Sequence, residues 1–484
     1  MQLRNSNLLQ SQCFINNNWI NSKENKTFNV TNPATGEIII AVADGDIEET
    51  EQAIHAAAKA FCKWSKRTAY ERALIMRRWF NLITENADDF ALLMSSEQGK
   101  PLAEAKGEVT YGASFIEWFA EEGRRIYGDV IPTPAHNKRI ITIKQPVGVV
   151  AAITPWNFPV SMITRKISPA LAAGCTVVVK PPSETPLCAL ALTRLALEAG
   201  FPEGVINVIT TTNSKEVGKV LTQHPDVKKV SFTGSTEVGK LLMEQCASTL
   251  KKVSFELGGN APSIVFDDAD IEQAVKGTLA SKYRNAGQTC VCTNRILVQE
   301  NIYPQFMQQY SKAVADLKVG EGIKEGVQIG PLITEKAVKK VERLLKDAIS
   351  KGGKITLGGK RHEQDELFFQ PTIIENCNAT MDLHEEEIFG PVSALFKFKT
   401  EEEAIQMANN TNYGLAAYFF SQNINRVWRV AEALEYGMVG INEGIISHAE
   451  APFGGVKESG IGREGSKYGI EDYVEIKYLC LGGM

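Results

Sequence analysis

The sequence has no long hydrophobic run. None of its apolar stretches approaches the 18 or so residues that a transmembrane helix requires. The first segment, M-Q-L-R-N-S-N-L-L-Q, lacks the apolar core of a secretory signal. We therefore expect a cytoplasmic protein without a membrane partner.

A block of basic residues is also missing. The 52 Lys and Arg residues are outnumbered by 57 Asp and Glu residues, and the formal net charge is −5. Proteins that bind nucleic acid or anionic membranes carry clustered Lys and Arg. The composition therefore predicts no nucleic-acid partner.

Cysteine and histidine are few and dispersed. The chain has nine cysteines and six histidines, and the only close pair is Cys290 and Cys292 in N-A-G-Q-T-C-V-C-T-N-R. A zinc site usually needs C-x₂₋₄-C spacing and a second pair of ligands, and both are missing. Scattered thiols favour a reducing compartment over a disulfide framework. We predict no metal site, and the cysteine pair remains open as a nucleophile with a neighbour or as a redox couple.

The length and the hydrophobic pattern predict an α/β protein of two or three units. A chain of 484 residues exceeds a single simple core. The first 125 residues read mainly as helices, with stripes over 47–61, behind a possible Asp46 cap, and over 71–94. Short apolar strands then alternate with helical patterns, which predicts a mostly parallel sheet covered on both faces. The expected strands are 147–153, 176–179, 205–209, 229–232 and 253–255.

A second α/β region is expected over about 260–455. It opens with a helix over 271–285 that leads into the cysteine pair. The tail E-D-Y-V-E-I-K-Y-L-C-L alternates as a strand does, and 139–144 does the same. Together they predict an arm that pairs with another sheet or subunit.

Polar and glycine-rich segments follow the expected strands, where parallel sheets bind their ligands. They are T-P-W-N-F-P, K-P-P-S-E-T-P, F-T-G-S-T-E-V-G and E-L-G-G-N. Gly234 and Ser235 open a helix directly after a strand, so free backbone N–H groups can face a phosphate. The literal G-x-G-x-x-G at 460–465 follows no strand, and we interpret it as a glycine-rich turn.

These segments resemble the motifs of the aldehyde dehydrogenase superfamily along essentially the whole chain. P-W-N-F-P, F-T-G-S-T, E-L-G-G-N, G-Q-T-C, E-E-I-F-G-P and P-F-G-G-V-K-E-S-G occur in the family's order and spacing. The stretches S-F-I-E-W-F-A-E-E and L-E-Y-G-M-V-G-I-N are most similar to the NADP-dependent bacterial succinate-semialdehyde dehydrogenase group. The resemblance implies a Rossmann-like cofactor domain (1–125 and 146–257), an α/β catalytic domain (258–455) and a small β arm (126–145 and 470–484). The arm implies a homo-oligomer, with a tetramer favoured over a dimer.

The same resemblance implies a covalent mechanism. Cys290 would attack the aldehyde carbon, and the amide of Asn157 with the backbone N–H of Cys290 would stabilise the oxyanion. Glu256 would activate the water that hydrolyses the resulting thioester. Lys166 and Glu464 match proton-relay positions of relatives, and ordinary salt bridging is the alternative for both.

NADP is expected as the preferred cofactor, with NAD also possible. Lys180 matches the family residue at the adenosine ribose or its phosphate. NAD-selective relatives commonly carry a glutamate where this chain has Ser183, and a hydroxyl there would not repel a 2′-phosphate. Glu184, the next residue, favours NAD instead. The remaining cofactor positions implied by the resemblance are Thr154, Trp156, Gly234, Ser235, Leu257, Glu387 and Phe389.

The expected substrate is a small aldehyde with a carboxylate tail, succinate semialdehyde. Arg165 and Arg284 match the residues that hold this tail, with Ser447 as a hydroxyl partner, and structural ion pairs are the alternative for the arginines. Glutarate semialdehyde or a neutral aldehyde remains an alternative, since one methylene changes binding by only about 1–3 kcal/mol.

Two other interpretations differ in class. A CoA-acylating enzyme would tend to lack the glutamate found at Glu256, and a non-catalytic module would be expected to lose Cys290, Glu256 or Asn157. Cys292 is expected to pack beside the site. A strained disulfide with Cys290, which would block the nucleophile, is the remaining redox option.

Overall fold

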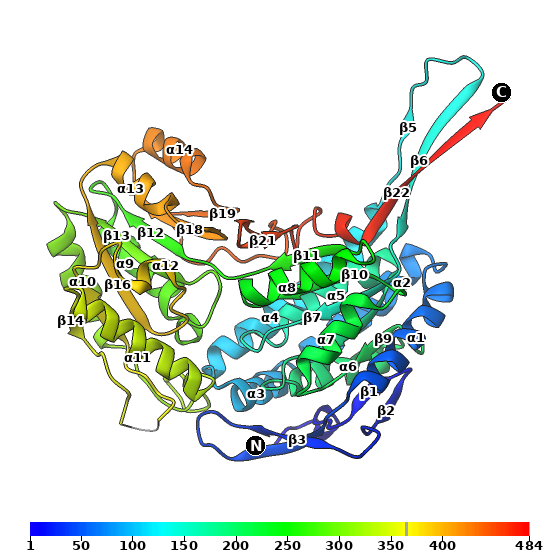
Figure 1. The fold of residues 1–484 in the computed structure, drawn as a ribbon, viewed down its shortest axis with the longest axis horizontal. Coiled ribbons are helices and arrows are strands. Elements are labelled where there is room, and N and C mark those ends of the chain that lie inside the picture. Colours follow the sequence, from blue (N-terminus) through cyan, green and yellow to red (C-terminus); the bar gives the residue numbers. More distant parts are fainter. Residues whose placement is uncertain (364–365, 484) are drawn as a thin grey trace.

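The computed structural model of the protein describes residues 1–363 and 366–483. Two large sheets lie in separate lobes, and a narrow arm projects from one lobe (Figure 1). No helix in these described ranges is both long and apolar enough to cross a membrane.

The first lobe contains an eight-stranded sheet in the order β2-β1-β9-β8-β7-β10-β11-β21. The five predicted strands are confirmed, and β9, β8, β7, β10 and β11 run parallel as expected. Their side chains are almost entirely buried because helices cover both faces. The bounds are β1 (Cys13–Ile15), β2 (Asn18–Ile20), β7 (Val149–Ile153), β8 (Thr176–Lys180), β9 (Ile206–Val208), β10 (Val227–Thr233), β11 (Lys252–Glu256) and β21 (Gly460–Ile461).

Eight helices belong to this lobe. They are α1 (Ile47–Trp64), α2 (Ala69–Glu85), α3 (Ala87–Gln98), α4 (Leu102–Glu122), α5 (Ser161–Ala173), α6 (Leu187–Ala199), α7 (Ser214–Gln223) and α8 (Thr236–Ala247). The Asp46 cap of α1 is confirmed: its side chain accepts the N–H of Ile47, and Glu49 completes a capping box.

Helices predominate in the first 125 residues, as expected, but one expected helix is divided and four strands were not expected. The 71–94 stripe is two helices, because the Asn86 side chain donates to the carbonyl of Leu82 and competes with the helical backbone. The first 45 residues hold four strands, including β3 (Thr27–Thr31) and β4 (Ile38–Ala43). The β1–β2 hairpin turns at Asn16 and Asn17, both with positive φ, so an Asn-Asn hairpin signal was missed.

The second lobe is built on a seven-stranded sheet in the order β14-β15-β16-β13-β12-β18-β19, parallel except for β14. Its strands are β12 (Ala261–Val265), β13 (Thr293–Gln299), β14 (Lys354–Leu357), β15 (Thr372–Glu375), β16 (Val392–Phe398), β18 (Ala416–Phe420) and β19 (Met438–Ile441). Its helices are α9 (Ile271–Tyr283), α10 (Tyr303–Ala315), α11 (Glu335–Ser350), α12 (Asp382–Glu385), α13 (Glu401–Asn409) and α14 (Ile424–Ala433). The small pair β17 (Tyr413–Gly414) and β20 (Val456–Lys457) lies beside the last loops.

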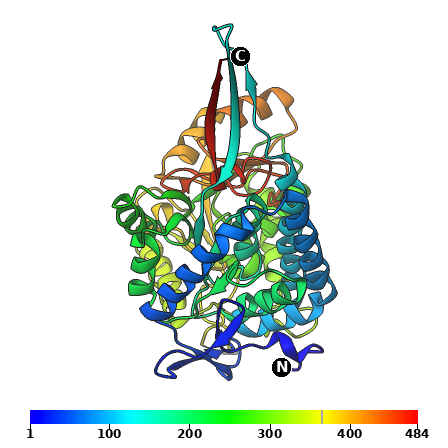
Figure 2. The same cartoon turned by 90° about the vertical axis from the view of Figure 1, so that its right-hand side faces the viewer.

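The arm consists of three antiparallel strands, β5 (Val130–Ile131), β6 (Lys138–Pro146) and β22 (Val474–Gly482). The two strands expected from the sequence are confirmed, and they pair with each other from Val474 opposite Pro146 to Gly482 opposite Lys138. The arm stands clear of the body in both views (Figures 1 and 2). Large apolar side chains on it, including Val130, Ile476 and Tyr478, are exposed.

Candidate active site

Cys290 lies in the short connection between α9 and β13. The predicted helix ends at Tyr283, and a 3-10 turn follows (Arg284–Gly287) in which Asn285 and Ala286 have φ of 52° and 55°. Left-handed backbone is strained for residues with a Cβ and needs support from outside. The Asn285 N–H donates to Glu104 at 2.7 Å, which ties the cysteine loop to α4.

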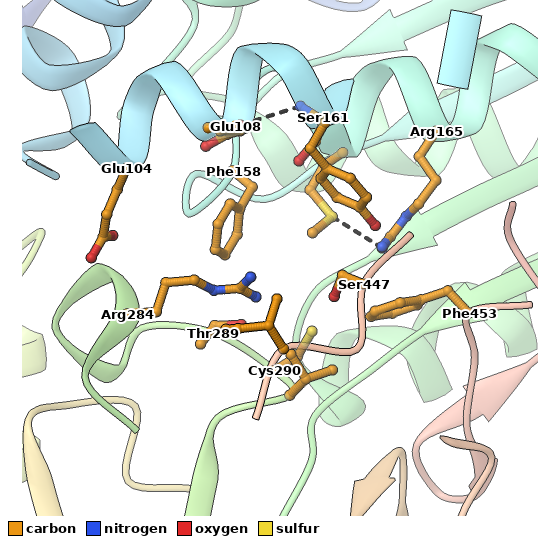
Figure 3. A pocket seen from close by; sticks show the side chains of 15 residues that line it. Glu104, Glu108, Phe158, Ser161, Arg165, Arg284, Thr289, Cys290, Ser447 and Phe453 are labelled. Carbon is orange, nitrogen blue, oxygen red and sulfur yellow. Dashed lines mark hydrogen bonds between the residues drawn. The ribbon is translucent and has the colours of Figure 1, made fainter. Parts of the chain in front are cut away.

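The Cys290 side chain lines a cavity of about 270 Å³ (Figure 3). The walls come from α4, from the first turn of α5 and the residues before it, from the cysteine loop, and from the segment around Ser447. Apolar side chains predominate, and charged groups enter from α4, α5 and the cysteine loop. The lining residues are Glu104, Gly107, Glu108, Tyr111, Phe158, Ser161, Met162, Arg165, Arg284, Thr289, Cys290, Val291, Ile445, Ser447 and Phe453.

Burial raises the pKa of the Cys290 thiol to about 12, although Arg165 lowers it in part. A pKa in this range favours the protonated thiol at neutral pH. A thiolate is the reactive form of cysteine, so the site must supply a route for this proton.

Asn157 follows β7 and reaches the cysteine loop. Its side-chain N–H donates to the carbonyl of Gln288 at 3.0 Å, and the other N–H of the same amide remains for a ligand. The amide oxygen is buried without a hydrogen-bond partner among the described residues. The structure thus brings a fixed amide donor beside the cysteine loop.

Glu256 is the last residue of β11 and is 1% exposed. Burial raises the pKa of its carboxyl group well above the usual value, and the nearby Glu464 raises it further. Neither carboxyl oxygen has a hydrogen-bond partner among the described residues. Such a group is suited to accept a proton from water, because its titration moves toward neutral pH.

Glu464, Lys166 and Arg165 form a buried ion cluster. Lys166 lies 2.5 Å from one oxygen of Glu464, and Arg165 contacts the other oxygen. Burial alone would raise the pKa of Glu464, but Lys166 and Arg165 outweigh it and lower the pKa. Burial lowers the pKa of Lys166. The salt bridging weighed as an alternative for these residues is present, and Arg165 takes part in it.

Arg165 and Arg284 both reach the cavity that holds Cys290, and Ser447 lies on the same wall. Arg165 packs 4.1 Å from the centre of the Phe453 ring. The half-buried Arg284 lies 5.2 Å from the centre of the Phe158 ring and points into the space between Phe158 and Cys290 (Figure 3). The cavity therefore holds the thiol of Cys290 together with the guanidinium groups of Arg165 and Arg284.

The segments expected to hold a dinucleotide lie at the carboxyl ends of β7, β8, β10 and β11. Gly234 donates its N–H to the carbonyl of Glu256 at 3.1 Å. Ser235 caps α8 by accepting the N–H of Val238 at 3.4 Å, and Leu257 covers Gly239 so closely that a Cβ there would lie 2.5 Å away. The Thr154 N–H donates to the carbonyl of Lys180 at 3.2 Å.

Lys180 is the last residue of β8, and Ser183 follows the strand. Burial lowers the pKa of Lys180 to about 8, although Glu184 opposes this shift. The Ser183 hydroxyl donates to Glu184 at 3.2 Å. Ser183 and Glu184 share a second cavity, of about 260 Å³, with Glu97, Thr212 and other residues.

The E-E-I-F-G-P segment returns to the same region from the second lobe. Burial raises the pKa of Glu387 to about 7, and its carboxyl group accepts the N–H of Gly259 at 3.3 Å. Phe389 has φ of 54°, and its ring meets Trp156 edge-on at 5.6 Å. The half-buried carboxyl of Glu387 and the Thr154 hydroxyl, which has no partner among the described residues, fit a hydroxyl-rich cofactor.

Cys292 is not among the residues that line the cavity of Cys290. Its sulfur is 3.4 Å from the ammonium of Lys282 and 3.3 Å from the Lys282 carbonyl. Both cysteines of the pair are free thiols here. Within the described ranges the one metal-competent group is His55, His224 and Asp226, which the sequence did not bring together, and Nδ1 of His224 already accepts the Asp226 N–H.

The sequence reasoning missed the contribution of α4. Glu104 and Glu108 of α4, together with Lys100 just before this helix, contact the turn at Asn157 and the cysteine loop. A signal was present: two glutamates four residues apart within an apolar helix, preceded by a lysine at the same spacing.

Comparisons with known proteins agree with this geometry. The aldehyde dehydrogenase family model matches residues 19–479. The succinate-semialdehyde dehydrogenase [NADP(+)] of Escherichia coli (strain K12) is 59% identical over 482 residues, covering 100% of both chains. The glutarate-semialdehyde dehydrogenase of Pseudomonas putida (strain KT2440) is 59% identical over 481 residues, covering 99% of this chain and 100% of that protein. The crystal structure of an E. coli NADP-dependent enzyme superposes with a TM-score of 0.99 at 58% identity, covering 99% of this chain and 100% of the other.

Family model, relatives and solved structure all extend along nearly the whole length, and residues of three motifs, Phe158, Cys290 and Phe453, line one cavity. The chain belongs to the aldehyde dehydrogenase family.

Proposed function

We propose that this chain oxidises succinate semialdehyde to succinate, with NADP as the preferred cofactor and NAD as a possible one. One observation carries the proposal: Cys290, Arg165, Arg284 and Ser447 line the same cavity. A thiol that attacks one end of a four-carbon semialdehyde requires cationic groups at the other end, where the carboxylate lies. The names of the E. coli and P. putida relatives support this substrate class.

In the proposed reaction the sulfur of Cys290 bonds to the aldehyde carbon and its proton leaves the site. The amide of Asn157 and the backbone N–H of Cys290 donate to the oxygen that becomes negatively charged. A nicotinamide held by the proposed cofactor residues, Glu387 and Phe389 among them, would supply the acceptor for the hydride of this carbon. Glu256 then takes a proton from the water that attacks the carbonyl carbon of the thioester. The carbon–sulfur bond breaks, the acid is released, and the thiolate of Cys290 is free to take up a proton again.

Lys166 and Glu464 are proposed to carry the proton of Glu256 onward. Glu464 is charged and touches Lys166, and both lie close enough to Glu256 to alter its pKa. A proton on the buried carboxyl of Glu256 could thus pass to Glu464 and Lys166.

Lys180 and Ser183 are proposed to contact the adenosine ribose and its 2′-phosphate. Thr154, Trp156, Gly234, Ser235, Leu257, Glu387 and Phe389 are proposed to complete the cofactor surface. On this proposal the first lobe with 1–125 and 146–257 binds the cofactor, and 258–455 supplies the nucleophile.

The arm, 126–145 with 470–484, is proposed to join copies of the chain into a homotetramer. The outer edge of β22 has no partner strand among the described residues, and apolar side chains on the arm are exposed. Such edges favour pairing with another chain. We propose a cytoplasmic protein, which the free thiols support.

Glutarate semialdehyde is the second candidate substrate, because the P. putida relative carries that name at the same identity. One additional methylene changes binding by about 1–3 kcal/mol, so the two substrates require direct comparison.

The test is a comparison of kcat/KM for succinate semialdehyde, glutarate semialdehyde and butanal with each cofactor. We expect both semialdehydes to exceed butanal, and NADP to exceed NAD. Arg284→Ala should raise KM for succinate semialdehyde far more than for butanal, whereas Arg343→Ala, an exposed arginine on α11, should change neither. Equal effects of Arg284→Ala on both aldehydes would refute the tail-binding role, and a tenfold preference for NAD would refute the cofactor assignment.

A further inference from the structure

We propose that Lys100, with its charge balanced by Glu108, is a positioning residue that holds the amide of Asn157 in place for the oxyanion. The inference rests on the proposed function, because an oxyanion forms only if Cys290 attacks a carbonyl carbon. Lys100 lies behind the residues that line the substrate cavity, so it acts through Asn157 and not on the substrate.

The backbone at Lys100 has little freedom to move. Lys100 is in the short connection between α3 and α4, after Gly99 with φ of 92°. This connection packs against the second lobe: a Cβ at Gly330 would lie 2.2 Å from the Gly99 carbonyl oxygen, and one at Gly322 would lie 2.3 Å from that of Lys100. The Lys100 side chain is therefore directed inward, and the residue is 2% exposed.

The ammonium group of Lys100 contacts the turn that carries Asn157. It lies 2.5 Å from Oε2 of Glu108 and 2.7 Å from the carbonyl oxygen of Asn157. It also lies 3.9 Å from the centre of the Phe158 ring, on the side chain that Arg284 contacts. A lysine ammonium has three N–H donors, and these three contacts occupy all of them.

Glu108 holds the other end of the same turn. Its Oε1 accepts the N–H of Val160 at 2.9 Å and that of Ser161 at 3.2 Å, at the start of α5. Residues 157–161 are thus held between a buried cation and a buried anion. Replacing a buried ion pair with apolar groups of similar volume is often neutral or stabilising, so stability alone does not explain this pair.

The position of the Asn157 carbonyl matters because two parts of the site meet there. The side-chain amide of Asn285, from the cysteine loop, donates to this oxygen at 3.0 Å, beside the contact from Lys100. The Asn157 side chain donates in turn to Gln288 in the cysteine loop. A shift of this carbonyl would change the distance between the Asn157 amide and Cys290.

The decisive variant is Lys100→Met/Glu108→Gln. It keeps the side-chain volumes, leaves no unpaired buried charge, and keeps an amide oxygen to accept from Val160 and Ser161. We expect kcat to fall by about tenfold or more for succinate semialdehyde and butanal alike, approaching the roughly 10²–10³-fold loss typical of removing an oxyanion donor. KM for NADP should be unchanged. Lys106→Met, an exposed lysine on α4 paired with Asp88, is the matched control and should leave kcat unchanged.

A double-mutant cycle with Asn157→Ala separates positioning from a general effect on folding. If Lys100 acts through Asn157, Lys100→Met/Glu108→Gln should reduce the kcat of the Asn157→Ala protein by less than about threefold. The effects of substitutions at coupled residues do not add. Equal fold-losses in both backgrounds would overturn the inference. If the paired variant does not fold, Lys100→Gln takes its place in the same cycle.

Failure of the proposed function gives a different result. Wild-type protein that oxidises butanal but not the semialdehydes would refute the substrate assignment and leave the cycle measurable with butanal. Wild-type protein that oxidises no aldehyde with either cofactor would refute the proposed function, and the inference with it.

Discussion

At the scale of single residues, two buried glutamates a short distance apart have pKa values that are shifted in opposite directions. The pKa of Glu256 is raised by burial and by Glu464, whereas Lys166 and Arg165 lower the pKa of Glu464 and keep it charged. Pairs of acids whose environments separate their pKa values are a common basis for dividing acid and base roles. Glu256 can therefore exchange a proton beside a group that stays ionised.

Glu256→Gln should separate the two halves of the reaction. The amide cannot take a proton from water, so we expect hydrolysis of the acylated enzyme to slow by about 10²–10⁴-fold while acylation continues. Rapid mixing should show a burst of reduced cofactor close to one per active site, followed by slow turnover. A steady, slow rate without a burst would instead place Glu256 in the first step.

The pH dependence of cofactor use should follow Lys180. Burial lowers the pKa of its ammonium to about 8, and only the charged form attracts a 2′-phosphate. The ratio of kcat/KM for NADP to that for NAD should therefore be highest below about pH 8 and should fall as the pH rises through this value. Lys180→Met should give a low ratio that does not change with pH. A wild-type ratio independent of pH would contradict the contact.

The sequence allowed the prediction of residues that carry chemistry, but not of their supports. Cys290 and Glu256 lie in recognisable motifs next to strands. The partner of Lys166, in contrast, is 298 residues away, and Lys100 and Asn157 are 57 residues apart. The spacing of Lys100, Glu104 and Glu108 is visible in the sequence, but which distant residue each side chain contacts depends on tertiary packing, and no local pattern indicates it.

At the scale of secondary structure, the glycine-rich turn of 460–465 has a steric role beside Glu256. Gly460 has φ of 137°, and a Cβ there would lie 1.9 Å from the carbonyl oxygen of Phe255, on the strand that ends in Glu256. We expect Gly460→Ala to push β21 away from β11 and to reduce activity by tenfold or more, measured as kcat with butanal.

A glycine with open space around it provides the control for this prediction. Gly218 lies inside α7, and a Cβ added there would meet no neighbouring atom of the described residues within 4 Å. Gly218→Ala should stabilise the protein by about 0.5–1 kcal/mol and leave kcat unchanged. Full activity in Gly460→Ala would show that the turn tolerates a side chain.

The central strands were easier to predict from the sequence than the points where a helix ends or the chain turns. The five central strands are apolar runs between helices, and burial on both faces makes their pattern continuous. The division of 71–94 depends on one asparagine amide, and the β1–β2 hairpin depends on strands of three residues. Short elements of this kind depend on partners elsewhere in the fold, such as β9 for β1.

At the scale of the whole molecule, the arm should determine the oligomeric state. Ile476 and Tyr478 are 68% and 59% exposed on β22. Ile476→Glu/Tyr478→Glu should convert the expected tetramer into smaller species, measured by light scattering after size-exclusion chromatography. Ile38→Glu, an exposed residue on β4, should leave the mass unchanged. An unchanged tetramer in the arm variant would assign assembly to another surface.

The Gly99–Pro101 connection also links catalysis to the docking of the two lobes. Its backbone is held by Gly322 and Gly330 of the second lobe, where the Leu102 N–H donates to the Gly322 carbonyl at 2.8 Å, and its lysine holds the Asn157 turn of the first. A small separation of the lobes would therefore disturb the Asn157 turn before either sheet unfolds. During chemical denaturation, enzymatic activity should disappear at lower denaturant concentration than the far-ultraviolet signal of helices and strands.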